Sequence, residues 1–403
     1  MIPKMLSYLC EMTKQGDEFF KDIRPYRDHE IQEVFERLLK HPAVERLVSK
    51  FFPTIPLNAF AEKLRKIDTV YDFQENILHQ IVNHVLDSTS SGFTYSGVEN
   101  VDRYKNHLFI SNHRDITLDP TLITTALVNN GFNTPEVAIG NNLIQEPWIS
   151  DVLRLTKSFI VKRNLPAKEL ILFSKKLSQY IYYVLTETNQ SVWIAQREGR
   201  AKDGNDITQP GLFSMLGMSS KNGLIQHFQV LNIIPVSISY EFDPCDMEKV
   251  RSLYAQRFLG GYKKRPKEDE DSMKHGIVGF KGHINIHFGH CLNEYLMEFP
   301  TDEHKNETIT RIRHLIDDQI IMGYKLWPTN YIAHDLYMHN TPQFECYDKE
   351  QREYFIDNIE EKLTHLEGDM DELRRIFYEM YARPVINKHK IQTEGSLHLE
   401  PNK

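Results

Sequence analysis

The first quarter of the chain carries apolar residues at helical spacing. One such stretch follows Asp28 and runs to Pro53, and a second follows Asp68 and ends before Gly92. Apolar residues three and four positions apart line one face of a helix, and Pro or Gly ends such a pattern. We therefore predict a helical N-terminal region over residues 1–92.

The pattern changes in the centre of the chain to short, strongly apolar runs bounded by Gly, Asn and Pro. Their length and their content of β-branched residues are typical of buried strands, and helical stretches separate them. We predict an α/β domain over residues 93–297, with a mixed, largely buried sheet flanked by helices. The predicted strands are 108–111, 137–139, 158–161, 192–195, 233–240 and 284–288.

Helical spacing returns after the centre, first in residues 303–326 and then in residues 348–381. The final stretch, residues 392–403, shows no periodicity, and we expect it to be frayed. The sequence thus predicts a C-terminal helical region over residues 298–403 that ends in an unstructured tail.

Composition and charge narrow the possible functions. The chain has 403 residues, 40% of them hydrophobic and 26% charged, which is enough to bury a large core. Its formal net charge of −8 gives no general electrostatic reason to bind nucleic acid. Any site for an anion must therefore be local.

The sequence also carries information on the compartment. Its four cysteines form no C-x-x-C pair, which argues against a zinc ribbon or a disulfide framework and favours a reducing cytoplasm. The apolar start is short and is soon followed by Glu11 and Lys14, unlike a signal peptide. The longest stretch without charged residues, 222–240, contains polar residues and Pro235, so it predicts no membrane span. We expect a cytoplasmic protein.

A candidate catalytic pair follows the first predicted strand of the central domain. The strand ends at Asn112 and His113, and a carboxylate follows six positions later at Asp119. A histidine at the end of an α/β strand, with a carboxylate to hold its Nδ1–H, can act as a general base. Asp115 is a competing partner for the histidine, and a purely structural histidine is the alternative interpretation.

Basic residues follow two further strands. Lys162 and Arg163 end one strand, and the next is followed by a loop with Arg197, Glu198, Gly199 and Arg200. Side chains that converge from two strand ends would form a local cationic pocket, and the donor fork of Arg suits a phosphate. Ordinary surface ion pairs are the alternative.

Two other segments could carry function. Residues 211–218 are rich in Met and Leu and could line an apolar groove for an acyl chain, although core packing is the favoured interpretation. His283 and His287 share one face of a predicted strand, and His290 follows them. No carboxylate or cysteine completes a ligand set, so we predict no metal site.

Four blocks of the predicted α/β domain, namely the histidine segment, the two strands with basic ends and the apolar strand that contains Pro235, resemble in their order those of the glycerophospholipid acyltransferase family. Its members carry a His-x4-Asp motif, a strand that ends in Arg, a loop of the Pro-Glu-Gly-Thr-Arg type and an apolar strand with Pro. Residues 95–100 and 138–148 are similar to the segments that precede and link the first two blocks. The segments that match the four blocks are 112–119, 159–163, 198–200 and 233–236.

The resemblance implies transfer of a fatty acyl group from a thioester, either acyl-CoA or the acyl-carrier protein thioester acyl-ACP. The acceptor would be the hydroxyl of a glycerol phosphate or a lysophospholipid, with His113 as general base and Asp119 as its partner. No metal and no cofactor besides the thioester co-substrate is implied. The residues implied in acceptor binding are Arg163, Glu198, Gly199 and Arg200, with Lys162 and Arg197 in second place and Arg114 and Asp115 along the pocket.

The chain departs from the family pattern at two points. The spacing from His113 to Asp119 is one residue longer than in the family, and in the loop Arg197, Arg200 and Ala201 stand where the family has Pro, Thr and Arg. Two other functions stay open: acylation of a different lyso-lipid, such as an aminolipid, and lipid or membrane-surface binding by a degenerate domain. Any membrane contact should be peripheral, on the cytoplasmic face.

Overall fold

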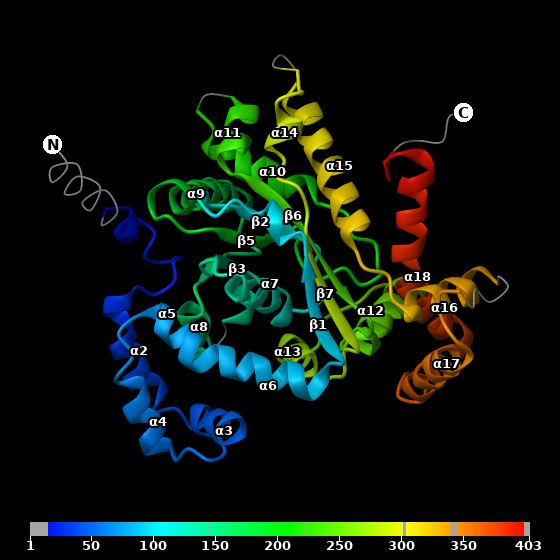
Figure 1. Cartoon of the computed structure of the whole chain (residues 1–403), viewed down its shortest axis with the longest axis horizontal. Coiled ribbons are helices and arrows are strands. Elements are labelled where there is room, and N and C mark those ends of the chain that lie inside the picture. Colours follow the sequence, from blue (N-terminus) through cyan, green and yellow to red (C-terminus); the bar gives the residue numbers. More distant parts are fainter. Residues whose placement is uncertain (1–14, 145, 222, 301–303, 340–344, 399–403) are drawn as a thin grey trace.

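The computed structural model describes residues 15–398 except for 145, 222, 301–303 and 340–344. The N-terminal start, interpreted above as unlike a signal peptide, lies outside the described residues. Within them, a seven-stranded sheet lies at the centre and helices cover both of its faces (Figure 1). The predicted α/β class, with helices before and after the sheet, is confirmed.

The sheet is mixed, and its direction changes at one place. The strand order is β1-β7-β6-β2-β5-β3-β4, and every neighbouring pair is parallel except β6 and β7. The carboxyl ends of β2 to β6 therefore meet at one edge of the sheet, which is where α/β proteins place their sites. The strands are β1 (Gly92–Ser96), β2 (Leu108–Ser111), β3 (Glu136–Gly140), β4 (Ser158–Val161), β5 (Val192–Ala195), β6 (Ile233–Tyr240) and β7 (His283–Phe288).

Both faces of the central strands are buried, which explains why their sequences are almost wholly apolar. Successive side chains of a strand point to opposite faces. Leu108 and Ile110 of β2 accordingly join the core beneath α9 (Ala167–Glu187), whereas Phe109 between them joins the core on the other face, beneath α7 (Leu118–Asn129). All eight residues of β6 are buried.

The structure contains all six predicted strands and one that the pattern missed. The missed strand is β1, an edge strand that pairs with β7 only and whose last three residues are exposed. Its sequence lacks the continuous apolar run by which the buried strands were found. Pro235 lies near the start of β6, before the pairing with β7 begins at Val236, so its missing N–H leaves that ladder intact.

Helices precede the sheet as predicted. Their apolar faces form a separate core that includes Phe35, Phe52 and Phe60, and this core packs against α8 (Pro147–Leu155) through Leu155. The N-terminal helices are α2 (Ile31–Leu38), α3 (Pro42–Phe51), α4 (Leu57–Leu64), α5 (Val70–Phe73) and α6 (His79–Thr89).

Further helices follow β5, and the last of them form a third apolar core. The helices after β5 are α10 (Pro210–Leu216), α11 (Leu224–Val230), α12 (Asp246–Phe258), α13 (Glu268–Val278), α14 (Asn293–Leu296), α15 (Lys305–Gly323), α16 (Pro328–Met338), α17 (Lys349–Leu363) and α18 (Met370–Glu394). The third core joins α12, α16, α17 and α18, and Figure 1 shows these helices together at one end of the molecule.

The expectation that the last dozen residues are frayed is wrong for the part that the structure describes. Helix α18 continues to Glu394, and the residues after it are tied to α15. The Ser396 hydroxyl donates to Asp318 at 2.7 Å, and His398 Nε2 lies 2.9 Å from the carboxylate of Asp317. Anchoring by polar side chains leaves no hydrophobic period, so the sequence pattern could not reveal it.

The length and hydrophobicity of each helix decide whether it could cross a membrane. Within residues 15–398, apart from the undescribed gaps, no helix combines the length and the hydrophobicity that crossing a bilayer requires.

Candidate active site

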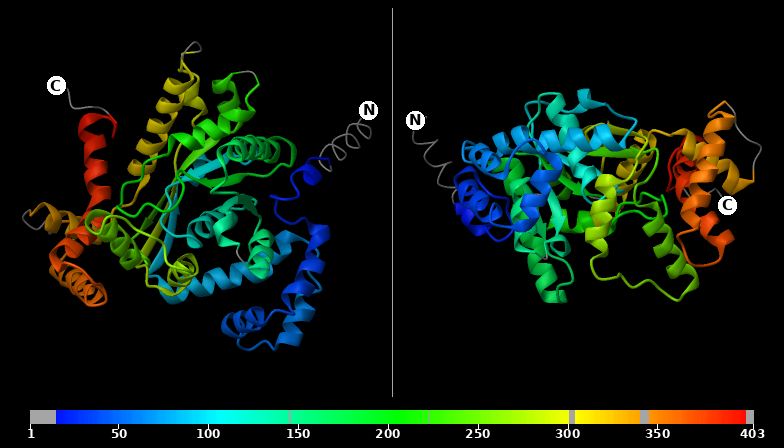
Figure 2. Two further views of the ribbon diagram at one scale, coloured as in Figure 1. Left: turned by 180° about the vertical axis from the view of Figure 1, so that it is seen from behind. Right: turned by 90° about the horizontal axis from the view of Figure 1, so that it is seen from below.

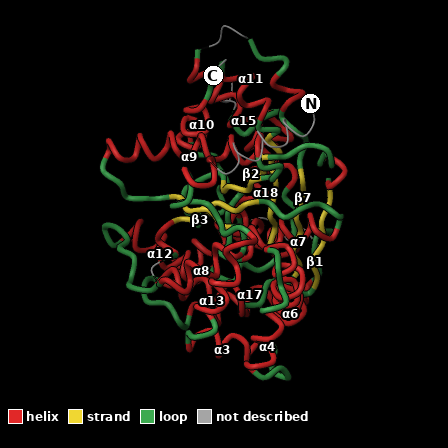
Figure 3. The backbone as a smooth tube through the Cα atoms, turned by 90° about the vertical axis from the view of Figure 1, so that its left-hand side faces the viewer, coloured by secondary structure: helices red, strands yellow, loops and turns green. Residues whose placement is uncertain are grey.

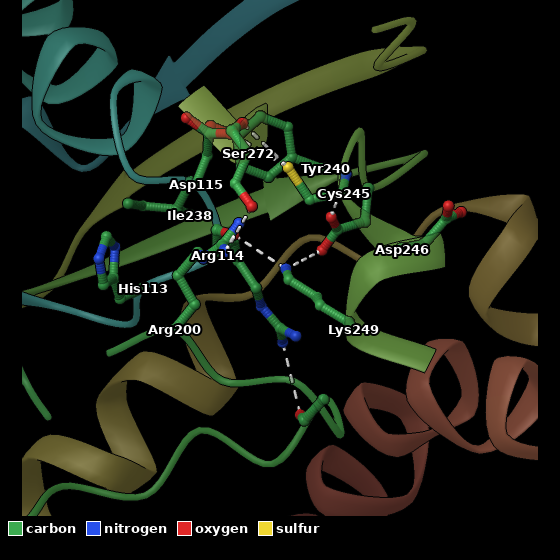
Figure 4. Close-up of polar contacts among 12 residues, drawn as sticks. His113, Arg114, Asp115, Arg200, Ile238, Tyr240, Cys245, Asp246, Lys249 and Ser272 are labelled. Atoms are coloured by element: carbon green, nitrogen blue, oxygen red, sulfur yellow. Dashed lines mark hydrogen bonds and ion pairs between the residues drawn. The ribbon is translucent and has the colours of Figure 1, made fainter. Parts of the chain in front are cut away.

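The candidate residues lie at the edge of the sheet where the parallel strands end. His113 follows β2, Arg163 follows β4 and Arg197 follows β5, and neighbouring β6 ends at Tyr240. Figure 4 shows His113, Asp115, Arg200 and Tyr240 grouped near this edge. Residues that are far apart in the sequence thus meet because the topology brings these strand ends together.

Asn112 fixes the backbone that carries the histidine. Its side chain is fully buried and bonds the backbone of Ile238 twice: Oδ1 accepts from the N–H at 2.8 Å, and Nδ2 donates to the carbonyl at 3.0 Å. The amide therefore takes the place of a backbone partner just where the pairing of β2 with β6 ends. This anchors the next residue, His113, to the central strand.

His113 and Asp119 form a hydrogen-bonded pair. The Nδ1 atom of His113 lies 2.8 Å from Oδ2 of Asp119, which is fully buried in the first turn of α7. The same oxygen accepts the backbone N–H groups of Arg114 (2.6 Å) and Asp115 (2.9 Å), and Oδ1 accepts the hydroxyl of Tyr240 (3.0 Å). Four donors thus hold the carboxylate in one orientation. Because a carboxylate only accepts, Nδ1 donates and Nε2 of the neutral ring is left as an acceptor.

Asp115, the competing partner, has a different position. Its Oδ1 accepts the backbone N–H groups of Thr117 (2.8 Å) and Leu118 (2.7 Å), so it caps the start of α7. Burial, together with the charge of Asp119, raises the pKa of its carboxyl group. The turn that Asp115 makes takes up the extra residue between His113 and Asp119 and still brings the second carboxylate to the histidine.

The loop after β5 runs beside the histidine. The N–H of Ala201 donates to the carbonyl of His113 at 2.9 Å, and Gly199 adopts a left-handed conformation with φ of 72°, which suits glycine. Arg200 donates from Nη2 to the Ser272 hydroxyl of α13 at 3.1 Å, while its buried Nη1 has no partner among the described residues. Arg200 therefore lies close to the histidine and keeps an unused donor.

The other predicted basic residues do not all converge. Arg163 pairs with Glu198 at 3.5 Å, which joins the ends of β4 and β5. Lys162 instead reaches toward Asp22 (3.4 Å) on the surface. Arg197 is half-buried, and its Nε has no partner within the described part of the chain. The structure thus brings Arg163 and Glu198 together and directs Lys162 elsewhere.

Arg114 points away from the histidine into a buried ionic network (Figure 4). Its guanidinium pairs with Asp206 at 2.5 Å, and its backbone carbonyl accepts from Nζ of Lys249 at 2.8 Å. Lys249 is almost fully buried and also pairs with Asp243. The backbone next to His113 is therefore held by a lysine of α12, and the Arg114 side chain lies in an interior ionic network with Asp206.

The two remaining candidate segments, residues 211–218 and the strand with His283 and His287, make packing and hydrogen-bond contacts within the protein. Phe213 and Leu216 of α10 are buried in the core beneath the sheet, as the favoured interpretation of residues 211–218 requires. His283 lies 2.7 Å from Glu241, and His287 lies 3.0 Å from the Ser96 hydroxyl. Among the described residues no group of three or more His, Cys, Asp or Glu could hold a metal ion.

Several residues around the histidine were missed by sequence reasoning. Lys249 and Ser272 lie far along the chain from His113 and belong to no predicted motif, and Tyr240 is predicted only as the end of the apolar strand that contains Pro235. The sequence predicts Asn112 as the end of a strand and the start of the 112–119 segment, but not as an anchor of the backbone. Its position directly before the histidine was the one available signal, because a buried Asn needs partners for both ends of its amide.

Comparison with known proteins agrees with the motifs. Residues 92–239 match the family model described as Acyltransferase. A search of curated proteins finds no match. Among solved structures, the chain is similar to the 1-acyl-sn-glycerophosphate (LPA) acyltransferase PlsC from Thermotoga maritima, with 13% identity and a TM-score of 0.33 over 71% of this chain and 92% of that chain. A TM-score this low carries no argument, so the acyltransferase domain is assigned from the family model alone.

The matched residues contain the histidine pair and the basic strand ends described above. The fold and this site therefore define an acyltransferase domain. The match agrees with the resemblance found in the motifs, since residues 92–239 carry an acyltransferase domain.

Proposed function

We propose that the protein transfers a fatty acyl group from a thioester to the hydroxyl of a glycerol phosphate or a lysophospholipid, with His113 as the general base. The observation that carries this proposal is the 2.8 Å contact between His113 Nδ1 and Asp119 within the matched acyltransferase domain. The contact leaves Nε2 of the ring free to accept a proton.

The proposed reaction balances without a covalent enzyme intermediate. Nε2 of His113 takes the proton of the acceptor hydroxyl as its oxygen attacks the thioester carbonyl carbon. The C–O bond forms, the C–S bond breaks, and the thiolate leaves with the proton that the imidazolium returns. Asp119 keeps the ring oriented and stabilises its charged form between the two proton transfers.

The acceptor phosphate would bind to the basic residues beside the histidine. Arg200 has a buried donor, Nη1, without a partner among the described residues, and a phosphate oxygen could fill that vacancy. Arg163 and Glu198 would form the rim of this pocket, and Gly199 would let the backbone approach the ligand. Lys162 and Arg197 would have secondary roles, whereas Arg114 and Asp115 would support the backbone around His113.

The same proposal covers the acyl donor and the place in the cell where the protein acts. The acyl group would come from acyl-CoA or acyl-ACP, with no metal and no further cofactor. We propose that the protein acts in the cytoplasm, in peripheral contact with the cytoplasmic face of a membrane, since that is where its lipid substrates would be found.

An acceptor panel tests this function. Purified protein is given each thioester donor with glycerol 3-phosphate, a lysophosphatidate, a neutral lysophospholipid or a lyso-aminolipid, and the products are identified by mass spectrometry. We expect a new acyl ester on a phosphorylated glycerol lipid. Transfer to the lyso-aminolipid alone would contradict the proposed acceptor, and no transfer with any pair would favour a degenerate binding domain.

A further inference from the structure

Helix α9 begins outside the body of the protein. All six residues from Ala167 to Leu172 are exposed, and the first buried residue of the helix is Phe173. Three consecutive apolar residues lie on this projecting end: Leu170, Ile171 and Leu172 are 45%, 60% and 69% exposed. Contiguous exposed apolar side chains are rare on soluble proteins and mark contact surfaces.

A second exposed apolar segment ends α12. Phe258 and Leu259 are 48% and 67% exposed, and two glycines follow them. The loop that continues to α13 carries Lys263, Lys264, Arg265 and Lys267, all of them exposed. Residues 257–267 include five basic residues and no acidic one, in a chain whose net charge is −8.

Four acidic residues follow this loop in the first turn of α13, and the two nearest to it make contacts of their own. Glu268 is buried and accepts the hydroxyl of Tyr262, and Asp269 accepts from the side chain of Asn142 at 2.9 Å. Lys264 also pairs with Asp269. The exposed charge of the loop is therefore positive.

The two segments lie on one side of the molecule. Figures 2 and 3 show the amino end of α9 and the loop between α12 and α13 projecting in the same direction from the sheet. We name these two segments, residues 167–172 and 257–267, the projecting surface.

The candidate site borders the projecting surface. The loop that leads into α9 contains Arg163, whose backbone N–H donates to the Asn141 side chain at 2.9 Å. The neighbouring Asn142 bonds Asp269 of α13, and Arg200 bonds Ser272 of the same helix. The residues proposed to bind the acceptor thus lie between the two projecting segments.

We propose that the projecting surface docks the enzyme on a bilayer that contains anionic lipid. Exposed Leu, Ile and Phe side chains would enter the interface, while the flanking Lys and Arg side chains would meet the lipid phosphates. The purpose of this docking rests on the proposed function, since it would place the acceptor-binding residues at the membrane surface. Binding itself does not depend on catalysis.

Cosedimentation with vesicles tests this directly. We expect the wild-type protein to bind vesicles of phosphatidylcholine with phosphatidylglycerol and to bind vesicles of phosphatidylcholine alone far more weakly. Salt at about 0.5 M should release the protein, because it shortens the screening length to a few ångströms.

The double variant Ile171→Asp/Leu172→Asp and the single variant Leu259→Asp should each bind anionic vesicles roughly tenfold or more weakly than the wild type. Lys263→Glu/Lys267→Glu should lose about fivefold per charge.

Matched controls separate docking from general effects of charge and folding. Met297→Asp changes a 71% exposed apolar residue elsewhere, and Lys105→Glu/Lys349→Glu makes the same change in net charge away from the projecting surface. These controls should bind as the wild type does. Circular dichroism checks that every variant is folded.

The outcomes separate this proposal from the proposed function. Failure of the folded wild type to bind anionic vesicles, or equal binding by wild type and projecting-surface variants, would overturn the docking surface whatever the activity. Variants that lose vesicle binding but acylate a monomeric, short-chain acceptor at the wild-type rate would support it. Vesicle binding by a protein that acylates no acceptor would uphold the surface and contradict the proposed function.

Discussion

The hydroxyl of Tyr240 donates to Oδ1 of Asp119 at 3.0 Å, on the opposite side of the carboxylate from His113. Tyr240 ends the central strand β6 and is buried. The orientation of the carboxylate is therefore set by the sheet as well as by α7. This relationship makes Tyr240 a positioning residue that acts on the histidine through Asp119.

Tyr240→Phe should slow the reaction without weakening substrate binding. Loss of one hydrogen bond costs about 1 kcal/mol. If Asp119 is then less well oriented and the whole cost is added to the reaction barrier, kcat falls roughly fivefold. Steady-state kinetics should show a lower kcat with an unchanged KM for the acceptor. Tyr354→Phe, at a half-exposed position, is the control. A raised KM with unchanged kcat would argue against positioning.

The two carboxylates should respond differently to the same substitution. Asp119→Asn removes the acceptor of the Nδ1 proton, so we expect kcat to fall by about 10²-fold or more. Asp115→Asn keeps a side-chain oxygen that can cap α7, and its rate should fall far less. A larger rate loss for Asp115→Asn would reverse the assignment. Both proteins need thermal unfolding curves, since each carboxylate also bonds backbone groups.

Arg200 should matter for the acceptor more than for the chemical step. Arg200→Ala removes a guanidinium with a buried, unpartnered donor, and we expect the apparent KM for a phosphorylated acceptor to rise about tenfold or more. The KM for the thioester should change little. Arg65→Ala, on the N-terminal helices, is the control. An unchanged KM for the acceptor would remove Arg200 from the proposed pocket.

Local sequence signals predicted the fold and the histidine pair well. The buried strands are continuous apolar runs, and His113 and Asp119 are separated by a single turn before α7, so both features depend on nearby residues. The partners of Arg114 and Lys162 depend instead on distant segments, as does the position of Tyr240. Edge strand β1 and the anchored end of α18 escaped prediction because polar contacts define them.

Buried Lys281 predicts a dependence of stability on pH. Its ammonium donates to the Thr89 hydroxyl at 2.8 Å, and burial lowers its pKa to about 8. Between pH 8 and the ordinary lysine pKa of about 10.4, the unfolded chain holds a proton that the folded protein has lost, so stability rises with pH.

Comparison with a variant that cannot titrate isolates this effect. Urea unfolding of the wild type and Lys281→Met between pH 7 and 10.5 should show the wild type gaining stability relative to the variant above pH 8. A stability difference that stays constant over this range would show that the lysine titrates alike in both states.

The central claim is that His113 accepts the proton of the acceptor hydroxyl, and the initial rate of acyl transfer by His113→Ala tests it most directly. His290→Ala, at an exposed histidine, is the matched control. We predict a folded His113→Ala protein whose rate is at least about 10²-fold below that of the wild type, with His290→Ala at the wild-type rate. A folded His113→Ala protein that transfers acyl groups as fast as the wild type would contradict the account.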